Sequence, residues 1–103
     1  MTTRTFRNHI RKAFDELETH GYTARMNFEC CQSCGWNALG EEEAKKAVFY
    51  HNQDNEHIPK FKAVYLSWSG DGQFITSILS KYVTVDWDGA FNKRILIKAK
   101  EKV

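Results

Sequence analysis

The sequence predicts an α+β fold, a two-layer sandwich in which a mostly antiparallel sheet of about five strands carries two amphipathic helices on one face. Two apolar stripes with helical spacing occur near the N-terminus and around residues 73–82, and short alternating segments lie between and after them. Short turns join most of these segments, which favours antiparallel neighbours. Because the chain has 103 residues, we expect a single domain over residues 1–103.

The first helix is predicted from an apolar repeat at intervals of three and four residues, and Gly21 supplies its stop signal. The residues of this stripe are Phe6, Ile10, Phe14 and Leu17. The opposite face carries a basic group, namely Arg4, Arg7, Arg11 and Lys12. This group is a candidate partner-binding patch, with an ordinary solvated helix face as the simpler interpretation.

The first strand is predicted over Thr23–Cys30, where apolar and polar residues alternate. This alternation places Cys30 on the covered side, so we expect its side chain to point into the core. A short helical turn over Gly40–Ala47 should follow, since glutamate and lysine residues recur there four positions apart. Further strands are expected over residues 48–51, 62–69, 82–87 and 94–98, with a polar loop around Pro59 between the second and third strands.

The second long helix is predicted over Gln73–Tyr82, with Asp71 as its N-cap. The last two strands are joined by residues 88–93, in which Asp-Gly is the turn signal. The predicted order of elements along the chain is therefore helix, strand, short helix, strand, strand, helix, strand and strand. The expected core residues are Phe6, Ile10, Phe14, Leu17, Phe28, Val64, Leu66, Ile75, Ile78, Val85 and Ile95.

The composition argues for a soluble cytoplasmic protein that has no membrane partner. No apolar run approaches the roughly 20 residues of a membrane span, and the N-terminus lacks the apolar stretch of a signal peptide. Three cysteines are an odd number, and neighbours such as Cys30 and Cys31 rarely bond each other, so we expect reduced thiols. A formal net charge of +2 is too small to indicate nucleic-acid binding by itself.

All three cysteines fall within residues 30–34, and this cluster is the strongest indication of chemistry in the chain. Cys31 and Cys34 have the C-x-x-C spacing that aims two sulfurs of a tight turn at one point. Zinc prefers four ligands, and a strand pair joined over residues 31–51 would return His51 and Asp54 to the thiols. We therefore predict a zinc site made of Cys31, Cys34, His51 and Asp54.

Two other interpretations of the thiols stay open. Cysteine also packs as a small apolar side chain, so the cluster can be inert. A thiol redox or nucleophilic site, with His51 as the base, is the second alternative. Redox chemistry favours a cysteine at a helix N-terminus, and the segment Gly35–Asn37 is a poor helix opening.

Three blocks of the sequence resemble successive signatures of a bacterial domain family of unknown function. They are Cys-Cys-Gln-x-Cys-Gly from Cys30, His-x-Gln-Asp from His51 and Val-x-Trp-Asp-Gly from Val85, and the resemblance covers roughly residues 6–97. It implies that Cys31, Cys34, His51 and Asp54 belong to one site and that His57 does not. In size and type alone, the chain is also similar to small phage-encoded inhibitors such as anti-CRISPR proteins.

We expect from these observations a small non-enzymatic zinc domain that acts by binding a protein partner. Inhibition of a bacterial defence enzyme, such as a CRISPR effector, is the role that the likeness to phage inhibitors suggests. The alternatives are a thiol- or metal-dependent enzyme that uses Cys31, Cys34 and His51, and a basic nucleic-acid-binding module that uses the patch on the first helix.

Overall fold

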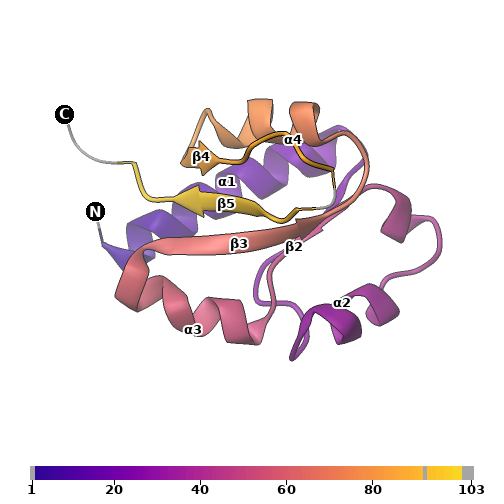
Figure 1. Cartoon of the computed structure of the whole chain (residues 1–103), viewed down its shortest axis with the longest axis horizontal. Coiled ribbons are helices and arrows are strands. Elements are labelled where there is room, and N and C mark those ends of the chain that lie inside the picture. Colours follow the sequence, from indigo (N-terminus) through magenta and orange to yellow (C-terminus); the bar gives the residue numbers. More distant parts are fainter. Residues whose placement is uncertain (1, 92, 101–103) are drawn as a thin grey trace.

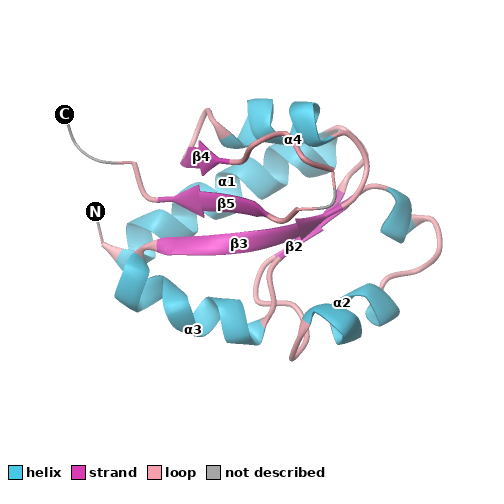
Figure 2. Ribbon diagram, in the orientation of Figure 1, coloured by secondary structure: helices cyan, strands magenta, loops and turns pink. Residues whose placement is uncertain are grey.

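A computed structural model describes residues 2–91 and 93–100, and it has an α+β fold built on one five-stranded sheet (Figures 1 and 2). The fold class predicted from the sequence is confirmed. The elements are α1 (Thr3–Thr19), β1 (Thr23–Arg25), α2 (Gln32–Ala38), the short 3-10 helix η1 (Glu43–Lys45), β2 (Ala47–Phe49), α3 (Asn52–Phe61), β3 (Ala63–Trp68), α4 (Gly72–Leu79), β4 (Thr84–Asp86) and β5 (Ile95–Lys98).

The sheet is mixed, with the strand order β1-β2-β3-β5-β4. Three of its pairings are antiparallel, as the sequence predicts, but β1 and β2 run parallel. Parallel neighbours need a long crossover connection, and residues 26–46 supply it with α2 and η1. The candidate site lies on this crossover.

The main core fills the space between α1, α4 and one face of the sheet. In Figure 1, α1 lies behind the sheet, and its predicted apolar stripe is buried. The buried residues that the sequence predicted correctly are Phe6, Ile10, Phe14, Leu17, Val64, Leu66, Ile75, Ile78 and Ile95. Val85 and Phe28 are only half-buried. Asp71 caps α4, as predicted, by accepting from the backbone N–H groups of Gln73 and Phe74.

The predicted strand Thr23–Cys30 is wrong beyond Arg25. Asn27 and Glu29 adopt left-handed backbone angles, with φ of 51° and 63°, and such residues cannot continue the alternation of a strand. The loop is instead fastened to the residues that follow β2, where Tyr50 accepts from the N–H of Phe28 at 2.8 Å. Cys30 is consequently exposed, and its predicted core position is also wrong.

The polar loop predicted around Pro59 is in fact the helix α3. Proline lacks the N–H that would bond to the carbonyl of Asn55 one turn earlier. Arg7 of α1 lies against this carbonyl, with its Nη2 atom 3.4 Å from the Asn55 oxygen and 3.1 Å from the side-chain Oδ1. A donor from another helix therefore replaces the missing one, and α3 continues to a left-handed C-cap at Lys62.

The remaining differences concern the ends of elements. The predicted helix over Gln73–Tyr82 ends earlier, at Leu79, and the strand expected over residues 82–87 is confined to β4. The short helical turn predicted within Gly40–Ala47 is present as η1. Over residues 2–91 and 93–100, none of the helices combines the length and apolar character that crossing a membrane requires.

Candidate metal centre

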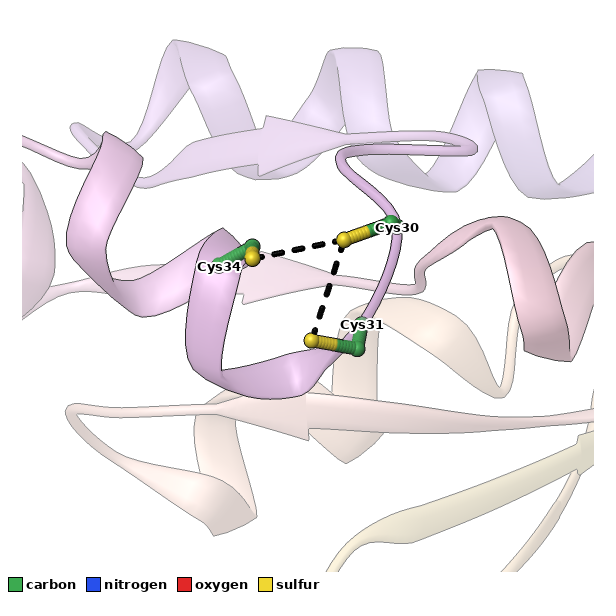
Figure 3. A group of neighbouring side chains, drawn as sticks. All are labelled: Cys30, Cys31 and Cys34. Atoms are coloured by element: carbon green, nitrogen blue, oxygen red, sulfur yellow. Dashed lines mark hydrogen bonds between the residues drawn. The ribbon is translucent and has the colours of Figure 1, made fainter.

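The three thiols are brought together where the crossover loop ends and α2 begins. Cys31 is the N-cap residue of α2, and Cys34 lies in the first turn of that helix. Cys30 precedes the helix, yet its side chain turns toward both of the others (Figure 3). The backbone of the loop is held beside the start of α3, because Glu29 accepts a 2.9 Å hydrogen bond from the N–H of Asn52.

The distances between the sulfur atoms suit a shared metal ion. Cys30 Sγ lies 3.3 Å from Cys34 Sγ and 3.9 Å from Cys31 Sγ, and all three atoms are within 4.8 Å of one another. Tetrahedral zinc with Zn–S bonds of about 2.3 Å places its sulfur ligands about 3.8 Å apart. The reduced cluster is therefore close to the arrangement that three thiolate ligands need.

The thiols influence one another's ionisation. The backbone N–H of Cys34 lowers the pKa of the Cys31 thiol, and the side chains of Cys34 and Cys30 lower it further. The neighbouring thiols of Cys30 and Cys31 raise the pKa of Cys34 to about 12. Without a cation, Cys31 therefore ionises more readily than Cys34. A bound metal ion would remove this mutual repulsion and release protons.

An aromatic cluster on the second face of the sheet positions α2. Gly35 is buried against the ring of Phe49, and a β-carbon at this position would lie only 2.4 Å from Phe49 Cε2. The rings of Trp36 and Phe28 meet Phe49 edge-on, with centroids 5.0 Å and 5.8 Å away. The close approach that glycine permits therefore fixes the helix whose first turn carries Cys34.

His51 and Asp54 lie together, but they form a buried pair of their own. His51 caps α3: its Nδ1 accepts from the N–H of Asp54 at 3.3 Å, and its Nε2 lies 3.1 Å from Asp54 Oδ2. Both ring nitrogens are thereby engaged, which assigns the proton to Nε2. Arg94 donates to the same Asp54 oxygen and to the carbonyl of Tyr65. His57 is exposed on α3, with its ring near that of Phe61.

The structure thus divides the predicted ligand set. Among the described residues, the three cysteines form the one group of at least three potential ligands whose atoms all lie within 4.8 Å. This group contains Cys31 and Cys34, does not contain His51 or Asp54, and adds Cys30, which the predicted strand had assigned to the core. A helix beginning near Cys31 was the missing signal, because it ends the predicted strand before Cys30 and places Cys34 in the first turn of the helix.

A hollow on the second face of the sheet, opposite α1 and α4, adjoins the Asp54 carboxylate. It measures about 420 Å³ and is lined mainly by apolar side chains, among them Phe61, Tyr65 and Leu96. Phe61 is 60% exposed and Tyr65 is 50% exposed, although aromatic side chains of this size are usually more buried. This face therefore offers apolar surface that residues 2–91 and 93–100 leave uncovered.

The predicted basic patch lies on α1. Arg4, Arg11 and Lys12 are exposed on this helix, whereas Arg7 is half-buried and holds Asn55 of α3. One of the four side chains thus has a role inside the fold.

A protein-family model described as a domain of unknown function, DUF6891, matches residues 2–101. No curated protein and no solved structure gives a significant match to this chain. The match spans nearly the whole sequence, and the chain therefore belongs to the DUF6891 family.

Proposed function

We propose that this domain binds one zinc ion through the thiolates of Cys30, Cys31 and Cys34, and that it acts without catalysis by binding a protein partner. The observation that carries the metal site is the contact among the three sulfur atoms, at 3.3 Å and 3.9 Å from Cys30. Thiolate ligands select soft or borderline ions, and zinc is the common one without redox chemistry.

The ion would sit at the surface, since Cys30 is exposed and Cys31 and Cys34 are half-buried. Three protein ligands leave the fourth position of a tetrahedral ion to water or to a side chain from outside the chain. A partner that supplies a histidine or cysteine there would bind only the zinc-loaded domain. The exposed rings of Phe61 and Tyr65 support a second contact with the same class of partner.

Zinc analysis tests the metal site directly. The protein is purified under reducing conditions without added metal, and zinc and thiols are then quantified. We expect about one equivalent of zinc, held by three thiolates. Cys30→Ser, Cys31→Ser and Cys34→Ser should each lower the zinc content, whereas Ser33→Ala, in the first turn of α2 beside Cys34, should not. Less than a few tenths of an equivalent after incubation with stoichiometric zinc would overturn the proposal.

Partner binding is tested separately from zinc binding. Tagged wild-type protein, the Cys31→Ser variant and the Phe61→Asp variant are used to capture proteins from the native host, and captured proteins are identified. We expect a defined partner whose capture depends on both the zinc site and the exposed ring of Phe61. Inhibition of a bacterial defence enzyme is the activity to assay. If the wild-type protein holds zinc but all three forms capture the same proteins, neither the zinc ion nor the surface around Phe61 binds the partner. That result would refute the partner-binding part of the proposal.

A thiol oxidoreductase is the second candidate, and one observation favours it. The sequence predicted no helix at Gly35–Asn37, yet α2 begins at Gln32 with Cys31 as its cap. In disulfide exchange, the Cys31 thiolate would attack a substrate disulfide and form a mixed disulfide. The first substrate thiol leaves in that step, and attack by Cys34 on the mixed disulfide would then release the second substrate thiol and leave a Cys31–Cys34 disulfide. Rapid, selective alkylation of Cys31 in zinc-free protein, together with reduction of a disulfide substrate, would favour this candidate.

A further inference from the structure

A small cavity lies between α2, the end of β3 and the segment that precedes β5. Its volume is about 100 Å³. The polar side chains that line it are Gln32, Ser67, Lys93 and Arg94, and Trp36 and Phe91 are among its aromatic walls. Gln32 and Trp36 come from α2, so the helix that carries the thiols also closes this cavity.

Two buried polar atoms of these lining residues lack a hydrogen-bond partner within the described part of the chain. They are Ser67 Oγ and Arg94 Nε, and the Ser67 residue is only 2% exposed. Most buried polar atoms in folded proteins are paired, because an unpaired one loses its hydrogen bonds to water without compensation. Two such atoms on lining residues of one cavity leave hydrogen-bonding capacity that no described residue uses.

The character of the lining indicates what that ligand is. A guanidinium, an ammonium, a hydroxyl and an amide can all donate hydrogen bonds, and none of the described lining residues is a carboxylate. Asp54 accepts from Arg94 Nη2 and so leaves Nε unpaired, whereas Asp88 lies 3.2 Å from the single ammonium nitrogen of Lys93 and partly neutralises it. Arg94 Nε, which can only donate, is left for an acceptor.

We infer that this cavity binds a small oxyanion, a carboxylate or phosphate group, through Ser67 and Arg94. Lys93 and Gln32 would stand at its mouth, since both are exposed. At about 100 Å³, the cavity suits the charged group of a ligand but not a large body. Any organic body attached to the anion would extend over Phe91, whose side chain is 86% exposed.

This site is distinct from the thiols, although they share a helix. Gln32 follows Cys31 directly, and Trp36 lies on the next turn of α2. Zinc at the thiols would hold one wall of the cavity in place, but no atom of the oxyanion site belongs to the metal site. Oxyanion binding is therefore measured on both zinc-loaded and zinc-free protein, and its failure would leave the zinc proposal untouched.

Titration followed by amide NMR and by tryptophan fluorescence, to which Trp36 and Trp68 of the cavity wall contribute, tests the inference. Inorganic phosphate, acetate and benzoate are each added at constant ionic strength, with chloride as the reference anion. We expect a saturable shift of the Ser67 amide signal with at least one of them. Saturation by phosphate alone identifies a phosphate site, and saturation by the carboxylates alone identifies a carboxylate site.

Two variants and one control make the test specific. Ser67→Ala should weaken the anion about tenfold, the effect of losing one hydrogen bond to a charged group. Arg94→Lys keeps the positive charge but removes Nε, and it should weaken the anion as strongly. The control is Ser77→Ala on α4, whose hydroxyl donates to the carbonyl of Phe74. Shifts that fail to saturate would show that no specific anion site exists, and saturable shifts that persist in both variants would place the anion elsewhere. Either result would overturn the inference.

Discussion

Replacing Gly35 by alanine tests whether the contact between α2 and Phe49 holds the thiols in place. The added β-carbon would lie 2.4 Å from Phe49 Cε2 and 2.8 Å from Cζ. Carbon atoms in contact prefer about 3.5–4.0 Å, so the helix or the ring must move by about 1 Å. Phe49 is 1% exposed and is packed by Phe28 and Trp36, which leaves the helix as the part that moves.

Two effects of opposite sign set the magnitude for Gly35→Ala. Alanine is better than glycine inside a helix by about 1 kcal/mol, whereas overpacking a buried position costs about 1–3 kcal/mol. We expect the steric term to win, with a net loss of about 1 kcal/mol in the free energy of unfolding. Because α2 carries Cys34, zinc affinity should also fall by about 10-fold to 100-fold, the usual effect of disturbing the support of a metal ligand.

Urea unfolding and competition for zinc with a chelator measure the two effects. Gly40→Ala is the matched control, because a β-carbon there would approach Glu43 Oε1 no closer than 3.4 Å. Phe49→Leu in the Gly35→Ala background should recover part of the lost zinc affinity by making room for the new methyl group. A Gly35→Ala protein that is more stable than wild type and binds zinc equally well would refute the reasoning.

Three further predictions follow from the buried polar groups. His51→Ala removes the N-cap of α3 and should cost about 1–2 kcal/mol in urea unfolding while the zinc content stays unchanged; loss of zinc would contradict the three-thiolate site. Burial raises the pKa of Tyr50 to about 12, so the folded protein keeps a proton that the unfolded chain releases near pH 10. Stability should therefore fall by about 2 kcal/mol between pH 10 and 12, and Tyr50→Phe should flatten this decline in alkaline denaturation. Arg7→Ala should cost about 1–2 kcal/mol by leaving the Asn55 carbonyl without its donor. The loss should be smaller in a Pro59→Ala background, where a backbone N–H is restored, and equal losses in the two backgrounds would contradict this account.

The parts of the fold that were predictable depend on local patterns. The apolar stripe of α1 recurs every three or four residues, and Asp71 sits where a helix cap belongs. Each of these patterns can be recognised from neighbouring residues alone, without knowing any contact to a distant part of the chain. The α+β class followed from them, because two apolar helix faces and several short strands have few ways to cover one another.

The two missed helices depend on residues far away in the sequence. The helix α2 has seven residues and lacks an apolar stripe, and it packs by setting Gly35 against Phe49 of β2. The helix α3 contains Pro59, and its free carbonyl is contacted by Arg7, which is 48 positions from Asn55. Neither contact is visible in a local window of sequence.

The sequence by itself determined where the candidate metal site lies, since all the cysteines fall in residues 30–34 and their spacing allows two sulfurs to meet. Only the tertiary structure decided which side chains join them. Left-handed angles at Asn27 and Glu29 end the strand early and turn Cys30 toward Cys34. Arg94, brought by β5 to the start of α3, pairs with Asp54 and so with His51. The spacing of residues along the chain shows which side chains can lie close together. Which of them are in contact depends on how segments distant in sequence pack.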